Sequence, residues 1–394
     1  GELNVTVCRT EYEQSDYYLR AAEATGIPRT NDFNGEKQEG VGYFQLNQKG
    51  GKRWSSAAAF LGKDVCKRKT LVIATKSVAA KILFHTTRAI GVHYLDSKGQ
   101  IQEVAAMQEV ILAAGALNTP TLLELSGIGQ RNVIESHGIE LKHELPGVGE
   151  NLQDHYHVQV QHGVNKGVTI SDDGKFPRVV FNVFKYLFTK RGLLAFPAAN
   201  IGAFYKTAGD TRPSMQIHFT PGAGGMDEKG NMTPSPVPGV NSTTCVLRPE
   251  ARGHVHIRST DPKAPPKILY NYLTNENDCK RAVDGVKKQR EIYAAAPFRD
   301  IATTEITPGA HVQTDEQILE YCRNEGGSVY HPVGTCKMGA ANDASAVVDN
   351  ELKVHGLHAL RVVDASIFPN LVSGNTHAPT VAVAEKAADM ILAD

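Results

Sequence analysis

The chain has 394 residues, of which 41% are hydrophobic, and its 42 lysine and arginine residues equal its 42 aspartate and glutamate residues. This length is sufficient for two hydrophobic cores. The balanced charge argues against a global field that would attract nucleic acid or an anionic membrane surface, and therefore favours small-molecule chemistry. No apolar run approaches the roughly 20 residues that span a bilayer. We expect no transmembrane segment, and a soluble protein that is cytoplasmic or membrane-peripheral.

The first 115 residues predict helices followed by a run of strands. A helix is predicted from Asp16 to Ala24, and Ser55 and Ser56 are typical of the start of a second helix. β-branched and alternating residues then predict strands at 70–75, 81–84, 89–94, 100–105 and 109–113. The last strand is predicted to be buried. It ends in small residues, Ala114 and Gly115, so a cofactor can approach the backbone closely there.

The middle of the chain has a different pattern. Short strands are predicted at 157–161, 215–220, 244–247 and 254–258, with proline-rich and glycine-rich connections. This pattern is typical of an antiparallel sheet with one face covered. Residues 179–188 are aromatic and apolar and predict a helix. We expect this helix to pack against the rest of the protein rather than to lie on a membrane surface.

The last 70 residues contain two histidines in turn-rich, otherwise apolar segments. His331 lies in VYHPVGTCKMG (329–339), and His377 lies in SGNTHAPT (373–380). Leu360 to Asp364 predicts a short strand, and Pro379 is well placed for the first turn of a helix that runs to Leu392. A neutral imidazole accepts a proton near pH 7, so two imidazoles beside a cofactor could deprotonate an alcohol while its carbon gives up a hydride. The pattern therefore predicts an enzyme.

These two segments, together with GALNTPTLLELSGIG (115–129), resemble the glucose-methanol-choline (GMC) flavoprotein oxidoreductases. The segment LPGVGENLQDH (145–155) follows as it usually does in family members, and the similarity is weakest from about residue 165 to residue 241. The resemblance implies FAD as the cofactor. It also implies an α/β (α+β) fold, with an incomplete FAD-binding Rossmann-like domain and a substrate domain whose antiparallel sheet is flanked by helices.

The implied domain boundaries are a connecting segment at 1–65, part of the FAD-binding domain at 66–153, a substrate-binding domain at 154–325, and the C-terminal part of the FAD-binding domain at 326–394. A family member is also expected to begin with a strand, a G-x-G-x-x-G turn and a helix that holds the FAD pyrophosphate. Gly127-Ile128-Gly129 continues as Gln130-Arg131-Asn132 and does not match this turn. We therefore expect the chain to be a C-terminal portion, with the N-terminal FAD-binding segment missing.

The resemblance implies oxidation of a primary alcohol to an aldehyde, by proton abstraction and hydride transfer to flavin N5. It identifies His331 as the general base. It places His377 at a second site, where family members carry His or Asn and where the side chain orients the substrate oxygen. Cofactor contacts are implied for Val78, Ala114, Gly115, Asp364, Ala365, His377, Pro379 and Thr380. The electron acceptor is expected to be oxygen, a quinone or another compound.

The substrate is less constrained by the sequence. The segments around residues 32–35 and 52–56 are most similar to the choline and alcohol dehydrogenase branch of the family. The resemblance places Asn200 in the substrate pocket, where choline-binding relatives carry a glutamate. The loss of that carboxylate favours a neutral primary alcohol. Two alternatives remain: a hydroxynitrile lyase of the same family, and a non-catalytic fragment that serves as an interaction module.

The cysteines and the paired histidines predict neither a disulfide framework nor a metal site. The six cysteines include no C-x-x-C pair, so reduced thiols are expected. His155 and His157, like His254 and His256, each place two imidazoles on one face of a predicted strand, a spacing that some metal sites use. No third ligand lies at a telling spacing in either case. We therefore predict no metal.

Overall fold

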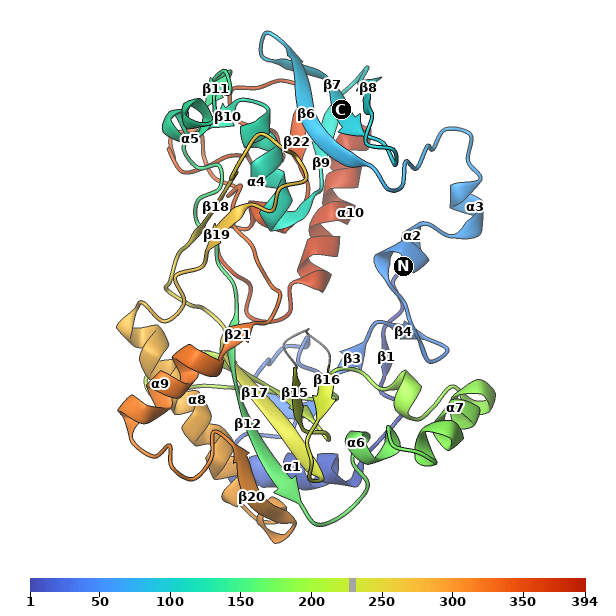
Figure 1. Ribbon diagram of the computed structural model, residues 1–394, viewed down its shortest axis with the longest axis vertical. Helices are drawn as coiled ribbons and strands as arrows, with labels where there is room; N and C mark the ends of the chain where they lie inside the picture. The colour runs from blue at the N-terminus through green and yellow to red at the C-terminus, as the bar shows by residue number, and fades with distance from the viewer. Residues whose placement is uncertain (227–231) are drawn as a thin grey trace. The chain divides into compact units, whose positions relative to one another are not determined.

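The computed structural model describes residues 1–226 and 232–394. The chain divides into two compact units (Figure 1). Unit 1 contains Gly1–Val72, Tyr156–Leu247 and Cys279–Gly327, and unit 2 contains Ile73–His155, Arg248–Asp278 and Ser328–Asp394. Residues 248–278 cluster with unit 2, whereas the sequence places them in the substrate-binding domain expected at 154–325. The first 72 residues, which include the connecting segment expected at 1–65, are part of unit 1.

Unit 1 is built on a seven-stranded sheet. Its order is β2-β13-β14-β17-β12-β20, with β21 also paired to β12. The pairings along this order are antiparallel. The strands are β2 (Gly40–Tyr43), β13 (Ile201–Tyr205), β14 (Met215–Thr220), β17 (Gly239–Val246), β12 (Tyr156–Val164), β20 (Ala302–Thr307) and β21 (Gly327–Ser328). The antiparallel sheet expected for the middle of the chain is thus present, although it recruits β2 from the N-terminal segment.

Two helices cover one face of this sheet. In α1 (Glu13–Ala24), the fully buried Tyr18 stacks on Phe219 with ring centroids 4.1 Å apart. In α8 (Glu276–Ala294), Gln289 accepts a hydrogen bond from Ser242 at 2.7 Å. Phe219 and Ser242 are cross-strand partners, so they face the same side of the sheet. A third helix, α9 (Asp315–Glu325), begins with a capping box formed by Thr314 and Gln317.

The aromatic segment at 179–188 forms a helix, α7 (Arg178–Thr189), as predicted. However, among the described residues of α7 only Asn182 is buried. Phe181, Phe184 and Phe188 have 69%, 55% and 83% of their surface exposed. The expectation that this helix packs against the rest of the protein is therefore wrong for the part of the chain that the structure describes.

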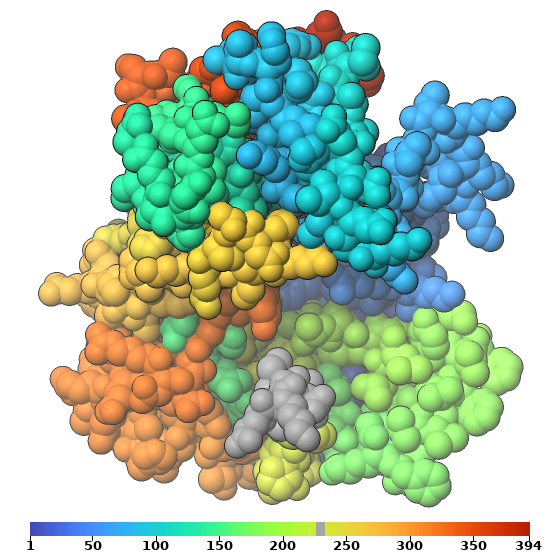
Figure 2. All heavy atoms as spheres, turned by 45° about the horizontal axis from the view of Figure 1, so that its top comes forward, coloured from blue at the N-terminus to red at the C-terminus, as the bar shows by residue number. Residues whose placement is uncertain are grey.

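Unit 2 contains an antiparallel hairpin layer and a parallel strand pair. The layer consists of β6 (Val78–His85), β7 (Arg88–Leu95) and β8 (Ile101–Ala105), and the pair consists of β9 (Val110–Leu112) and β22 (Leu360–Val362). The helices α4 (Gly115–Leu125) and α10 (His377–Ala393) follow these strands in the chain. The core includes Ile82, Leu123, Val348 and Val362. A separate hairpin, β18 (His254–His256) with β19 (Lys267–Leu269), lies in the golden-yellow segment at the surface in Figure 2.

Two details of the predicted strands differ from the structure. Residues 71–77 form no strand, and Val72 is 89% exposed, so the strand predicted at 70–75 is wrong. A β-branched run forms a strand only where a neighbouring strand can pair with it. The strand at 109–113 is present as β9 but is not fully buried, because Ile111 is 44% exposed between the buried Val110 and Leu112.

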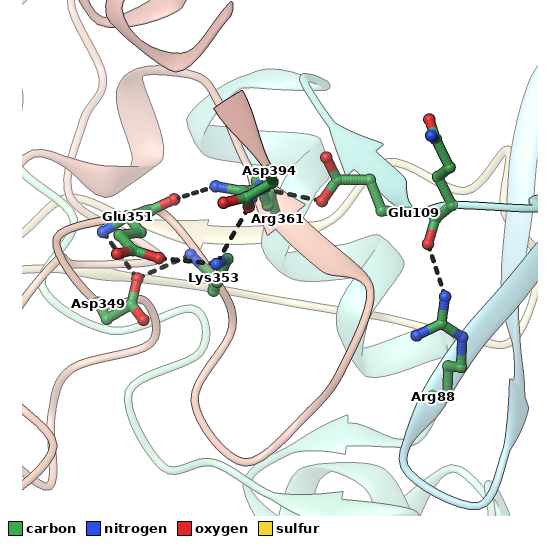
Figure 3. Close-up of polar contacts among 8 residues, drawn as sticks. Arg88, Glu109, Asp349, Glu351, Lys353, Arg361 and Asp394 are labelled. Carbon is green, nitrogen blue, oxygen red and sulfur yellow. Dashed lines mark hydrogen bonds and ion pairs between the residues drawn. The ribbon is translucent and has the colours of Figure 1, made fainter. Parts of the chain in front are cut away.

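The buried Arg361 joins the parallel strands to the C-terminal residue of the chain (Figure 3). Its Nε donates to Glu109 Oε2 at 2.8 Å, and its Nη1 donates to the carbonyl oxygen of Glu351 at 2.7 Å. Its Nη2 pairs with Asp394. Lys353 connects Glu351 and Asp394 at 2.7 and 3.1 Å. These contacts anchor β22 beside the start of β9.

The remaining elements are short: β1 (Thr6–Val7), β3 (Gln45–Leu46), β4 (Gln48–Lys49), β5 (Lys52–Arg53), α2 (Ser56–Phe60), α3 (Lys63–Cys66), β10 (Ile128–Gly129), α5 (Arg131–Ser136), β11 (His143–Glu144), α6 (Ile170–Asp173), η1 (Leu193–Ala195), β15 (Gly224–Met226), β16 (Met232–Pro234), η2 (Phe298–Asp300) and η3 (Ala365–Ile367). Among the described residues, none of the helices combines the length and the apolar character that crossing a bilayer requires.

Candidate active site

His331 lies in unit 2, in a segment that pairs with the residues before β12. Gln153 and Val333 exchange backbone hydrogen bonds of 3.0 and 2.9 Å. This pairing places His155 beside His331, and their Nδ1 atoms are 2.9 Å apart. His331 is only 8% exposed. The predicted general base is therefore a buried imidazole whose partner comes from a distant part of the sequence.

Asp154 fixes the backbone at His331. Its Oδ1 accepts a hydrogen bond from the His331 backbone N–H at 2.8 Å, and its Oδ2 accepts from Ser328 Oγ and from the Tyr272 hydroxyl, both at 2.5 Å. Burial raises the pKa of this carboxyl group, and the three hydrogen bonds oppose that shift. Asp154 lies in the 145–155 segment, but the sequence alone indicates no role for it.

Burial also determines the protonation state of His331. It lowers the pKa of this imidazole to about 4, so the ring is neutral near pH 7, which is the form that accepts a proton. The Asn375 Nδ2 atom lies 3.3 Å from His331 Nε2. An amide nitrogen can only donate, so this hydrogen bond assigns the lone pair to Nε2 and the hydrogen to Nδ1, facing His155.

The loop before α10 carries Asn375 and ends at His377, where the helix begins. Arg248 Nη1 donates to Ser373 Oγ at 2.8 Å and so holds the start of this loop. Asn375 then reaches His331, whereas His377 is the first residue of α10 and is exposed. Asn375 lies in the 373–380 motif, but the sequence alone indicates no role for it.

Four of the residues that were expected near the cofactor lie at one edge of the parallel strand pair. Ala114 and Gly115 follow β9, and Asp364 and Ala365 follow β22. Asp364 Oδ2 accepts hydrogen bonds from the Gly115 backbone N–H at 2.9 Å and from Thr119 Oγ1 at 2.6 Å. Gly115 has φ +83, and a Cβ added there would meet no atom within 4 Å. The turn is thus open on the side of Gly115, where a ligand can approach the backbone.

The other predicted cofactor residues lie on different elements. Val78 is the first residue of β6 and pairs with Leu95. Pro379 and Thr380 lie in the first turn of α10, and the Thr380 backbone N–H donates to the Thr376 carbonyl at 3.1 Å. The N-terminus of a helix of this length carries a partial positive charge, which is suitable for an anionic group.

Asn200, which was expected in the substrate pocket, lies in unit 1 immediately before β13. It is fully buried, and its Nδ2 donates to Ser15 Oγ of α1 at 2.8 Å. Its Oδ1 accepts no hydrogen bond from the described residues. Its role in substrate binding stays a prediction.

A buried histidine and a turn that a ligand can approach are typical of a cofactor-dependent enzyme, and the fold here is mixed α/β. Sequence profiles of the GMC oxidoreductase family match residues 1–157 and 249–384. The chain belongs to the GMC oxidoreductase family, whose members are FAD-dependent. The family resemblance and the mixed α/β fold with a large antiparallel sheet, both expected from the sequence, are confirmed.

Comparisons with individual proteins agree with this family assignment. The chain is 41% identical to alcohol dehydrogenase [acceptor] of Pseudomonas putida, over 100% of the chain and 70% of that protein. It is 40% identical to mitochondrial choline dehydrogenase of Mus musculus, over 99% of the chain and 65% of that protein. Among solved structures, pyridoxine 4-oxidase from Mesorbium loti matches with a TM-score of 0.87 and 26% identity, over 100% of the chain and 72% of that structure. The chain thus spans about two thirds of the length of these relatives.

Proposed function

We propose that this chain carries the catalytic base and part of the FAD site of an oxidoreductase that converts a primary alcohol into an aldehyde. The observation that carries the proposal is the buried position of His331 and its contact with Asn375. Its imidazole is buried and neutral, and the hydrogen bond from Asn375 leaves a lone pair on Nε2. A base of this kind accepts the hydroxyl proton as the substrate is oxidised.

Each neighbour of His331 has a separate part in this proposal. Asp154 holds the His331 backbone, and His155 Nδ1 accepts the hydrogen on His331 Nδ1, which stabilises the imidazolium that forms. Asn375 Nδ2 directs the substrate oxygen towards Nε2, and we assign His377 a role in orienting the same oxygen. FAD, when bound, supplies the hydride acceptor at flavin N5.

The residues around the β9 turn are suitable for FAD. The turn at Ala114 and Gly115 has open space beside it, and α4 begins there with backbone N–H groups that can meet an anionic pyrophosphate. Asp364 and Ala365 lie at the adjacent strand end. We also assign Val78, His377, Pro379 and Thr380 to this cofactor. The match of this chain to a family of FAD-dependent enzymes supports the assignment.

The substrate we propose is a neutral primary alcohol. Asn200 has no charge, so it offers no ion partner for a quaternary ammonium group. One relative is named for alcohol and another for choline, which is a primary alcohol with a quaternary ammonium group. Neutral primary alcohols and choline are therefore the substrates to compare.

The test is an anaerobic visible spectrum of the purified protein before and after the addition of primary alcohols and of choline. Flavin bands that bleach with an alcohol, but remain oxidised in a His331→Ala variant, are the expected result. His358→Ala is the control, because it removes an exposed histidine of the same unit. Its flavin bands should bleach as those of the parent do. Bands that persist with every alcohol would contradict the proposed oxidation, and bleaching by choline alone would contradict the proposed substrate.

A further inference from the structure

Two histidines and one glutamate of unit 2 form a cluster away from His331 in the sequence. Suitable ligand atoms of Glu150, His254 and His256 lie within 4.8 Å of one another, and all three residues are partly buried. The histidines are on β18, where residues two apart share a face, and Glu150 is on the loop after β11. The sequence showed the two histidines, but their third neighbour is about one hundred residues away in the chain.

The spacing within the cluster is suitable for tetrahedral metal coordination. His256 Nε2 and Glu150 Oε1 are 3.2 Å apart. Ligand atoms about 2.0–2.1 Å from a tetrahedral zinc ion are separated by about 3.3 Å. The rings of His254 and His256 stack at a centroid distance of 5.0 Å, so the second imidazole is next to the first.

A buried carboxylate determines which nitrogen of His256 faces the cluster. Glu124, on α4, is fully buried. Its Oε1 lies 2.6 Å from His256 Nδ1, and its Oε2 accepts from the Ile257 backbone N–H at 2.8 Å. The short contact places a hydrogen on Nδ1. A carboxylate that orients a histidine through the nitrogen away from the metal is a regular feature of zinc sites.

Two carboxylates flank the His256 ring. Glu124 Oε1 faces Nδ1, and Glu150 Oε1 lies 3.2 Å from Nε2. A metal ion bound by Glu150 and by Nε2 of His256 would also be within reach of His254. The cluster therefore offers three ligands to one ion.

The loop that carries Glu150 is held close to the histidine. The Val255 backbone N–H donates to the Gly149 carbonyl at 2.7 Å, and Gln130 Nε2 donates to Glu150 Oε1 at 2.6 Å. A Cβ at Gly149 would lie only 2.9 Å from His256 Nδ1. A side chain at Gly149 would therefore force the loop and the ring apart.

We propose that Glu150, His254 and His256 bind one divalent transition-metal ion, and that Zn²⁺ is the best fit to two imidazoles and one carboxylate. Water completes the coordination, since all three residues are partly exposed. The ion is structural, because it ties β18 to the loop at Gly149 and, through Glu124, to α4. This metal site does not depend on the proposed alcohol oxidation.

The test is calorimetric titration of the chelator-treated protein with Zn²⁺, together with its metal content after dialysis. We expect the parent to bind one equivalent. Loss of a residue that only orients a ligand weakens metal binding by roughly 10–100-fold, and we expect Glu124→Gln to weaken Zn²⁺ binding by that amount. Glu150→Gln and His254→Gln each remove a ligand and should weaken Zn²⁺ binding by more. His93→Gln is the matched control, because it removes a histidine that pairs with a glutamate, Glu103, on the surface.

A second measurement on the same proteins is the thermal unfolding midpoint with and without Zn²⁺. The ion should raise the midpoint of the parent and of His93→Gln but not that of His254→Gln, because an ion that binds only the folded state stabilises it. Two results would overturn the proposal. One is the absence of stoichiometric binding by the parent, and the other is unchanged binding and unchanged midpoint shift in both Glu150→Gln and His254→Gln.

Discussion

The contact between Asn375 and His331 leads to a specific prediction for Asn375→Asp. In the parent, Asn375 Nδ2 donates to His331 Nε2 over 3.3 Å. A carboxylate at this position cannot donate, and it favours a hydrogen on Nε2 instead. The substitution therefore stabilises the protonated ring and removes the lone pair from the nitrogen that should accept the substrate proton.

The size of the effect follows from the distance. Two unit charges about 3.3 Å apart interact with about 5 kcal/mol at an effective dielectric constant of about 20. Asn375 is exposed, so water screens part of this energy. We expect the pKa of His331, which burial lowers to about 4 in the parent, to rise by about 1–3 units.

The assay is the pH dependence of kcat/KM with the best alcohol substrate. A base must be unprotonated, so the rate falls below its pKa. The acidic limb of the profile should therefore move to higher pH in Asn375→Asp, and the plateau should fall. Asn370→Asp adds the same charge at an exposed position of the same segment and should leave the profile unchanged. An acidic limb at the same pH in Asn375→Asp and in the parent would refute the assigned hydrogen bond.

Three further predictions concern stability and are measured by urea denaturation. Arg361→Met leaves Glu109 without its buried partner and should lower the free energy of unfolding by about 3–5 kcal/mol. A decrease below about 1 kcal/mol would contradict this expectation. Burial alone would raise the pKa of Glu305, but hydrogen bonds from a histidine and an arginine lower it to about 2. Because the pKa of Glu305 is lower in the folded state than in the unfolded state, its charged form stabilises the fold above about pH 4.5. This contribution is lost as the pH falls to about 2. Glu305→Gln should therefore be less stable than the parent at pH 7, by about 1–3 kcal/mol, with a smaller difference at pH 3. Asp364→Ala leaves the Gly115 N–H unpaired and should cost about 1–3 kcal/mol, and Asp364→Asn should recover part of the loss.

Local motifs were sufficient to propose one part of the site. His331 was proposed through the family resemblance of the residues around it, and Ala114 and Gly115 were proposed because small residues follow a predicted strand in the company of the other motifs. The structure adds a hydrogen bond of 2.9 Å from the Gly115 backbone N–H to Asp364 Oδ2. Each of these motifs can be found in one sequence because its own residues lie within a few positions of one another.

Contacts between distant segments were not predictable in the same way. Asp154 meets the His331 backbone across 177 residues, and this contact depends on the pairing of Gln153 with Val333. The proximity of Glu150 to His256 depends in the same way on the hydrogen bond between Gly149 and Val255. Strand pairing between remote segments leaves no periodic signal in a single sequence.

Errors in the predicted elements have a related cause. The β-branched residues at 70–75 have the composition of a strand but form none. The helix α7 has the apolar pattern of a packed helix, yet Phe181 and Phe188 are exposed. Composition indicates what a segment can form, whereas the neighbours that decide whether it pairs or packs are supplied by the fold.

The measurement that tests the central claim most directly is the rate of anaerobic flavin reduction by the best alcohol, in a single turnover, for the parent and for His331→Ala. A general base contributes about 100-fold to 10,000-fold to such a step. We predict a loss in this range for His331→Ala at pH 7, with no loss for His358→Ala. Reduction of His331→Ala at the rate of the parent would contradict the assignment of His331 as the catalytic base.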